Sequence, residues 1–286
     1  MPRWLLPDSL EECWPALEEP ETRIYAGGTD VLVRLRAGLE KPRRLICLER
    51  ISELQGIEDR GDRVLIKSGT ALAAIAADPL VRTLFPVLTR AVQVLGSPPI
   101  RNMGTIGGNI CSASPAGDTL PPLYALRAEV DLARRGASRR LPIREFIPGP
   151  GCTALQPGEL LTGIWIPKNP SFRRQHYEKV GQRQALAIAI VSLAALIALD
   201  PAGIIEDIRL AWGSVGPTVA TVPAVEAGLK GQPLTLPVLQ EAAAAVRRAV
   251  APIDDLRAGA EYRRAVAGNL LLRLSLPPEN RPEVGP

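Results

Sequence analysis

Histidine is almost absent from this chain of 286 residues, in which His176 is the only one. A Ser-His-Asp or Cys-His catalytic centre would have to use that single residue, and zinc sites of the common histidine-rich kinds are excluded. If the chain takes part in catalysis, we therefore expect its reactivity to come from a bound cofactor.

Cysteine is scarce as well, and the cysteines at positions 13, 47, 111 and 152 form no CxxC pair. This spacing is typical neither of a metal-binding knuckle nor of a disulfide framework. We therefore expect no metal site, and a reducing cytoplasm as the compartment. The clustered thiolates that hold a [2Fe–2S] cluster are also missing from the sequence.

Long hydrophobic runs and a strong net charge are missing too. The longest apolar run, 185–199, is shorter than the about 20 residues needed to cross a bilayer, and the first residues lack the apolar core of a signal peptide. The net charge is only +4, and the basic residues, mostly arginine, are interleaved with acids. We therefore expect no membrane span, no signal peptide and no dedicated nucleic-acid surface.

The sequence does contain enough apolar residues for a sizeable core, at 46% hydrophobic and 22% charged. Short apolar strands and helical patterns are mixed without the regular βαβ alternation of a doubly wound sheet, which predicts an α+β fold. At this length we expect two or three compact lobes, and the polar segment 168–175 is the best candidate for a linker between them.

The first of two glycine-rich segments is Ile24–Val31, with the sequence IYAGGTDV. A strand runs into Gly27 and Gly28, and then into Thr29 and Asp30, which are both good helix N-caps. Glycines at such a place let backbone N–H groups converge on an anion. Taken alone, however, this segment is better explained as a plain strand-turn-helix corner.

The second segment, 97–122, is richer in glycine and small hydroxyl side chains. We expect it to be extended, with its backbone and hydroxyls satisfied by a ligand that carries phosphates and a polyol. The alternative is a long surface loop, but ordered loops beyond roughly 15 residues are uncommon unless they are functional. No Gly-Lys-Ser/Thr follows either segment, so neither is a P-loop, and neither is a dinucleotide-binding fingerprint of the doubly wound fold.

Together, AGGTD at 26–30 and IRNMGTIGGNICSASPAGDTLPPLYAL at 100–126 resemble the flavin subunits of the xanthine dehydrogenase and carbon monoxide dehydrogenase family. A third element, YEKVGQR at 177–183, stands at the expected distance. The resemblance spans nearly the whole chain, and the second motif carries it almost alone. It implies two FAD-binding lobes of the vanillyl-alcohol-oxidase (PCMH) type, at 1–55 and 56–170, and a C-terminal α/β lobe at 176–286.

The resemblance also implies which residues bind FAD. Residues 26–30 and 105–109 would wrap the pyrophosphate through backbone N–H donors, and Ser112 and Asp118 would bond the ribityl and phosphate side. Lys179 would reach the pyrimidine edge of the isoalloxazine, where a cation stabilises the reduced ring. The implied cofactor-binding residues are Ala26, Gly27, Gly28, Thr29, Asp30, Thr105, Ile106, Gly107, Gly108, Asn109, Ser112, Asp118, Leu161 and Lys179. The implied catalytic residues are Lys179 and Tyr177, with Tyr177 covering one face of the ring.

Simpler interpretations of three of these residues stay open. Lys179 fits a solvated charge at a strand edge, Tyr177 fits ordinary packing, and Asp118 fits a cap on the helix that follows it. The chain also departs from the family pattern at Ala187, where many relatives have an aspartate. A polar contact from that position to the ring or to a partner loop is therefore in doubt.

As a function, the resemblance implies an oxidoreductase subunit that accepts electrons from [2Fe–2S] clusters of a partner and passes them to an external acceptor. The expected partners are a molybdopterin-binding large subunit and an iron–sulfur small subunit, in a dimer of heterotrimers. The alternatives are a stand-alone FAD-dependent oxidoreductase of the same fold and a non-catalytic flavin-binding protein. We expect valine at Gly107 or Gly108 to abolish flavin binding and to leave the fold largely intact.

Overall fold

The computed structural model describes residues 2–276, which form two compact units. The first unit contains the chain up to Asp78 together with Pro98–Ala113 and Arg127–Lys168. The second contains Pro79–Ser97, Ser114–Leu126 and the chain from Asn169 onward. No helix in the described part of the chain is long and apolar enough to cross a membrane. The division of the chain into lobes 1–55, 56–170 and 176–286 stays a prediction.

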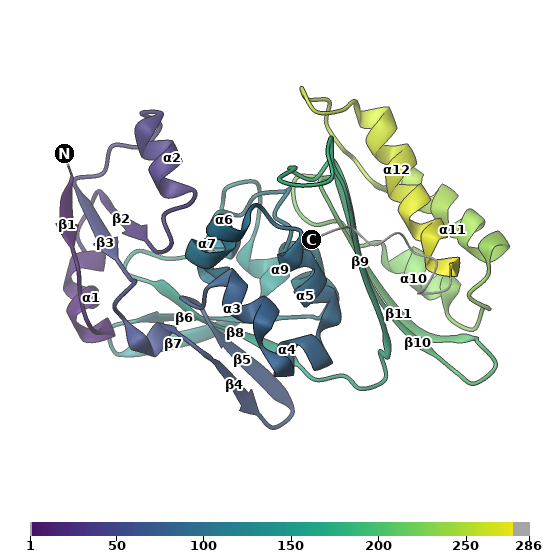
Figure 1. Cartoon of the computed structure of the whole chain (residues 1–286), viewed down its shortest axis with the longest axis horizontal. Coiled ribbons are helices and arrows are strands. Elements are labelled where there is room, and N and C mark those ends of the chain that lie inside the picture. Colours follow the sequence, from purple (N-terminus) through teal and green to yellow (C-terminus); the bar gives the residue numbers. More distant parts are fainter. Residues whose placement is uncertain (1, 277–286) are drawn as a thin grey trace. The chain divides into compact units, whose positions relative to one another are not determined.

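The first unit begins with a small parallel sheet in the order β1-β3-β2 (Figure 1). Its elements are β1 (Arg3–Leu5), α1 (Leu10–Leu17), β2 (Thr22–Tyr25), α2 (Val31–Arg36), β3 (Arg44–Cys47) and the short 3-10 turn η1 (Ser52–Leu54). Helix α1 starts at the N-cap Ser9 and buries Cys13 and Trp14 in a cluster with Ile46 of β3. Helix α2, by contrast, contains no buried residue.

A five-stranded antiparallel sheet completes the first unit, in the order β4-β5-β8-β6-β7. Its elements are β4 (Ile57–Arg60), β5 (Arg63–Lys67), α3 (Leu72–Ala77), α6 (Pro98–Met103), α7 (Ile106–Cys111), β6 (Glu129–Arg134), β7 (Ala137–Pro142), α9 (Ile143–Phe146) and β8 (Leu160–Pro167). Buried residues alternate along β5 and β6, and Val64 and Ile66 of β5 pair with the buried Ile166 and Ile164 of β8. This face supports the helices α3, α6 and α7 (Figure 1).

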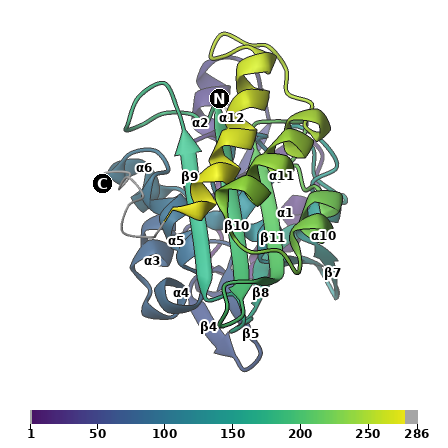
Figure 2. The same ribbon diagram turned by 90° about the vertical axis from the view of Figure 1, so that its right-hand side faces the viewer.

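The second unit is built on an antiparallel sheet in the order β11-β10-β9. Its elements are α4 (Pro79–Leu84), α5 (Pro86–Gln93), α8 (Leu120–Ala125), β9 (Arg174–Val180), β10 (Val191–Leu199), β11 (Ile205–Gly213), α10 (Pro223–Leu229), α11 (Leu236–Ala249), α12 (Ala260–Leu272) and η2 (Arg273–Ser275). Helices α10, α11 and α12 cover one face, as Figure 2 shows for α11 and α12. On that face, Trp212 of β11 donates a hydrogen bond from Nε1 to Ala267 O.

The predicted α+β class is confirmed, with two local differences. The first strands form a small parallel sheet joined by helices, so βαβ units do occur in this part of the chain. The segment 97–122 is helical in three places instead of extended. At α7 the reason is local, because the N-cap Thr105 accepts a hydrogen bond at Oγ1 from Gly108 N at 3.1 Å and so starts a helical turn.

Candidate functional site

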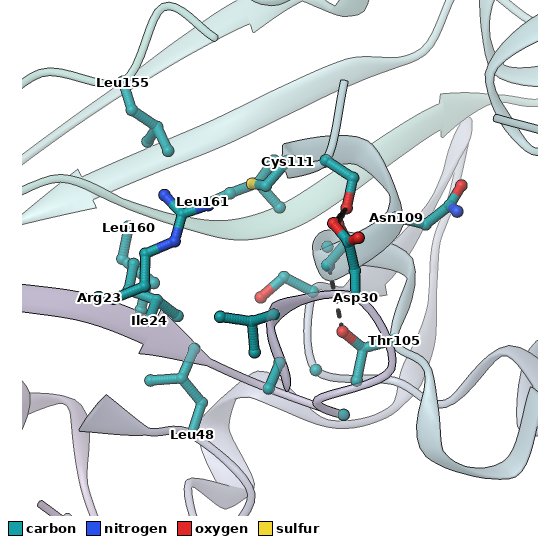
Figure 3. A pocket seen from close by; sticks show the side chains of 18 of the residues that line it. Arg23, Ile24, Asp30, Leu48, Thr105, Asn109, Cys111, Leu155, Leu160 and Leu161 are labelled. Carbon is teal, nitrogen blue, oxygen red and sulfur yellow. Dashed lines mark hydrogen bonds between the residues drawn. The ribbon is translucent and has the colours of Figure 1, made fainter. Parts of the chain in front are cut away.

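A pocket of about 430 Å³ lies in the first unit, within the range of small-ligand sites (Figure 3). It is formed by the end of β2, the loop that follows it, helix α7 and the chain between 151 and 161. The predicted site residues that line it are Ala26, Gly27, Gly28, Thr29, Asp30, Thr105, Gly107, Gly108, Asn109, Ser112 and Leu161. Ile106 is not among its lining residues, because its side chain is fully buried in the core. The two glycine-rich segments therefore meet at one cavity.

The two segments lie directly against each other at Gly27. A Cβ atom added there would lie 1.6 Å from Met103 O and 2.9 Å from Gly104 Cα, so only glycine fits. The next residue, Gly28, has a φ of +68°, a left-handed conformation that side chains disfavour. A hydrogen bond of 2.8 Å from Ser112 Oγ to Asp30 Oδ2 joins the far ends of the segments.

The backbone N–H groups of the two segments differ in what they bind. Among the described residues, the N–H groups of residues 27–30 donate to no other group. In α7, in contrast, Ile106 donates to Thr70 O, Gly107 to Ser68 O, and Asn109 to Thr105 O. Gly108 N is also bonded, to Thr105 Oγ1. The first segment therefore offers unbonded amide donors to a ligand, and residues 106–109 do not.

Gly107 and Gly108 have different roles in the structure. A Cβ atom on the buried Gly107 would lie 2.7 Å from Ser68 Cβ and 2.8 Å from Ser68 O, so this glycine lets α7 pack against the chain after β5. On the exposed Gly108, a Cβ atom would approach only Thr105 Oγ1, at 3.0 Å, and would otherwise project into open space. The expectation that valine leaves the fold largely intact is therefore wrong at Gly107, whereas at Gly108 it is compatible with the structure.

Three charged side chains line the pocket, namely Arg23, Asp30 and Glu159. Glu159 is buried and accepts hydrogen bonds from Arg139 Nε at 2.7 Å, Arg139 Nη2 at 2.8 Å and Gln156 N at 2.7 Å. The hydrogen bond from the Arg139 guanidinium is the main cause that lowers the pKa of Glu159. This carboxylate is therefore neutralised within the protein and holds the edge of the pocket in place.

Replacing Glu159 with glutamine is expected to lower the free energy of unfolding by about 1–2 kcal/mol at pH 7, since Arg139 is partly exposed and solvent screens the pair. The pKa of Glu159 is lower in the folded chain than its unfolded value of about 4.3. The contribution of ionised Glu159 to the free energy of unfolding is therefore present above its unfolded pKa and is lost as the pH falls through its folded pKa. Urea unfolding of both proteins should show the difference shrinking between pH 6 and pH 3.5, and a constant difference would contradict the assignment.

The other predicted site residues form a cluster in the second unit. Asp118 accepts hydrogen bonds from Tyr177 OH at 2.9 Å and Lys179 Nζ at 2.7 Å, and Lys179 Nζ also donates to Val94 O at 2.8 Å. The side chains of Lys179 and Asp118 are only 6% and 8% exposed, so the interpretation of Lys179 as a solvated strand-edge charge is wrong. Burial raises the pKa of Asp118, and the Lys179 charge acts in the opposite direction.

None of these three residues lines the pocket of the first unit, and their contact with a cofactor stays a prediction. Several lining residues were not predicted from the sequence, among them Arg23, Cys111, Leu155 and Glu159. Burial raises the pKa of the Cys111 thiol to about 12, so this thiol is uncharged where it lines the pocket. Arg23 could have been proposed from the sequence, because it lies on the strand that leads into the first pair of glycines.

Comparison with known proteins assigns nearly the whole chain to one protein family. Residues 1–169 match the family model of the FAD binding domain in molybdopterin dehydrogenase, and residues 176–277 match that of the CO dehydrogenase flavoprotein C-terminal domain. The chain is 31% identical to the xanthine dehydrogenase FAD-binding subunit of Escherichia coli O157:H7, over 86% of this chain and 85% of the relative. It is 32% identical to the glyceraldehyde dehydrogenase medium chain of Sulfolobus acidocaldarius, over 93% of this chain and 94% of the relative.

Solved structures support the same family. The carbon monoxide dehydrogenase of Hydrogenophaga pseudoflava contains a chain that matches with a TM-score of 0.90 and 30% identity, over 95% of both chains. This confirms the predicted fold, an FAD-binding domain followed by a C-terminal domain. The chain therefore belongs to the FAD-binding subunits of the xanthine dehydrogenase and carbon monoxide dehydrogenase family of molybdenum hydroxylases, which are oxidoreductases with FAD as the cofactor of this subunit.

Proposed function

We propose that this chain binds FAD in the pocket of its first unit and is the electron-transfer subunit of a molybdenum hydroxylase assembled from separate chains. The observation that carries the proposal is the meeting of both glycine-rich segments at one cavity, with the unbonded amides of residues 27–30 on its wall. Successive unpaired amides in a glycine turn are a common way for proteins to hold phosphate groups.

The other lining residues suit the remaining parts of FAD. The bare Cα of Gly108 allows a ligand to approach the backbone of α7 closely, and the hydroxyl of Ser112 lies beside it. Apolar side chains of Ile24, Leu48 and Leu161 provide a surface for an aromatic ring system (Figure 3). The residues present therefore fit a dinucleotide that has a diphosphate between polar and aromatic groups.

The wider role follows from what this chain contains. When bound, FAD supplies the redox chemistry, the exchange of electrons between iron–sulfur clusters of a partner and an external acceptor. The four cysteines are free thiols separated in the sequence, so the [2Fe–2S] clusters belong on a small subunit and the molybdopterin on a large one. Relatives named as medium chains support such an arrangement, which we place in a reducing cytoplasm as a dimer of heterotrimers.

Co-expression with the genes for its partner chains tests this proposal. The purified complex should contain three kinds of subunit, and extraction should release one FAD and no FMN per copy of this chain. The chain alone should bind FAD and should oxidise neither purines nor aldehydes when an artificial electron acceptor is present. Robust substrate oxidation by the lone chain, or a lone chain that takes up no flavin on reconstitution, would contradict the proposal.

A further inference from the structure

Arg23 is the one positively charged side chain that lines the pocket in the described part of the chain. It lies on β2, where its side chain is 51% exposed and extends into the pocket (Figure 3). Its charge partly opposes the rise in the pKa that burial causes for the Cys111 thiol, another group that lines the pocket. Arg23 lies outside both glycine-rich segments.

The contacts of Arg23 leave most of its guanidinium unused. Its Nε atom lies 3.0 Å from Glu40 Oε2, and the other oxygen of the same carboxylate accepts a hydrogen bond from Arg34 Nε at 2.6 Å. Glu40 is thus shared between two arginines. No acceptor among the described residues faces the Nη1 and Nη2 atoms of Arg23, so two planar donor groups remain beside the pocket.

The charges of the lining residues indicate that the pocket needs the Arg23 cation to bind an anion. The other two charged lining residues are acids, and one of them, Glu159, is already neutralised by Arg139. A diphosphate brings further negative charge into a site that contains the Asp30 carboxylate. A guanidinium binds phosphate oxygens through two parallel N–H donors, which the Nη atoms of Arg23 can supply.

We propose that Arg23 binds the diphosphate of the cofactor and is the residue that makes the pocket prefer the dinucleotide to flavins without a diphosphate. This inference rests on the proposed function, in that it takes the pocket of the first unit to be the FAD site. It deepens that proposal by assigning the recognition of the diphosphate to one side chain outside both glycine-rich motifs. The carboxylate of Glu40, 3.0 Å from Arg23 Nε, restrains the guanidinium at this end of β2.

Flavin titration of the full chain, freed of its cofactor, tests this inference. Arg23→Gln should raise the Kd for FAD about 10- to 100-fold, the loss expected for a charge-assisted bond to phosphate, and should leave the Kd for riboflavin unchanged. Arg23→Lys should recover part of the loss, since it keeps the charge without the planar fork. Arg34→Gln is the matched control, because it breaks the other ion pair of Glu40 and should leave both affinities unchanged.

The outcomes separate this inference from the proposal beneath it. Wild-type FAD affinity in Arg23→Gln, together with a loss in Gly108→Val, would overturn the role of Arg23 and leave the pocket as the FAD site. Unchanged FAD affinity in both variants would overturn the site itself. An equal loss of FAD and riboflavin in Arg23→Gln would show that Arg23 only supports the shape of the pocket, which also contradicts the inference.

Discussion

Replacing Gly108 with valine is expected to raise the Kd for FAD at least about 100-fold, which corresponds to about 2.7 kcal/mol, while the chain still folds. The side chain would project from α7 into the pocket, where its nearest neighbour is Thr105 Oγ1, and would block the approach of a ligand to the backbone. Helix α7 itself tolerates the change, since valine is a better helix former than glycine. Fluorescence titration with FAD and thermal unfolding of the free chain measure the two effects.

Gly107→Val is the matched variant and should behave differently. Its side chain would collide with Ser68 Cβ and Ser68 O, so it should destabilise the first unit by about 3 kcal/mol, the upper end of the typical cost of overpacking. The loss of FAD would then follow from the loss of structure. If both variants lose FAD with equal thermal stability, the assignment of different roles to the two glycines is wrong.

Lys179→Ala is expected to destabilise the second unit by about 3–5 kcal/mol, because it leaves the Asp118 carboxylate buried without its cation. The substitution also removes the donor to Val94 O, which ties β9 to the end of α5. Urea unfolding of the free chain measures the change in the free energy of unfolding. A change below about 0.5 kcal/mol, the size typical of exposed ion pairs, would show that the pair is solvated in solution.

The double variant Asp118→Asn with Lys179→Met separates charge from packing. It removes both buried charges and keeps similar side-chain volumes, so it should recover most of the stability that Lys179→Ala loses.

The double variant is also useful for testing the predicted action of Lys179 on the reduced flavin. A slower reoxidation of the complex is informative about electron transfer only where the second unit is as stable as in the wild type, so Lys179→Met with Asp118→Asn is the better probe.

The sequence predicted the cavity lining best where local chemistry decides the structure. The strand-turn-helix corner that contains Gly27, Gly28 and Asp30 could be found from its local pattern, but only the family resemblance assigned these residues to a ligand site. The sequence predicted α6 and α7 poorly, because helices of six residues are too short to show a hydrophobic period. It also could not show that Gly107 is needed for packing, since its neighbour Ser68 is far away in the chain.

The interleaving of the two units was beyond sequence reasoning for a related reason. Residues 79–97 and 114–126 belong to the second unit although the chain on either side of each belongs to the first. Their helices pack through side chains that meet partners distant in sequence, such as Gln175, which donates from Nε2 to Leu84 O. Asp118 comes together with Tyr177 and Lys179 through the same kind of contact, so the ion pair could be found only in the structure.

Hydrogen exchange of the chain with and without FAD tests whether FAD is bound in the pocket of the first unit. The N–H groups of residues 27–30 have no acceptor among the described residues, so their exchange should be fast without FAD and at least about tenfold slower with it. Peptides from α10 and α11 of the second unit should exchange at the same rate in both states. Protection that appears elsewhere and leaves residues 27–30 unchanged would show that FAD is bound at another place.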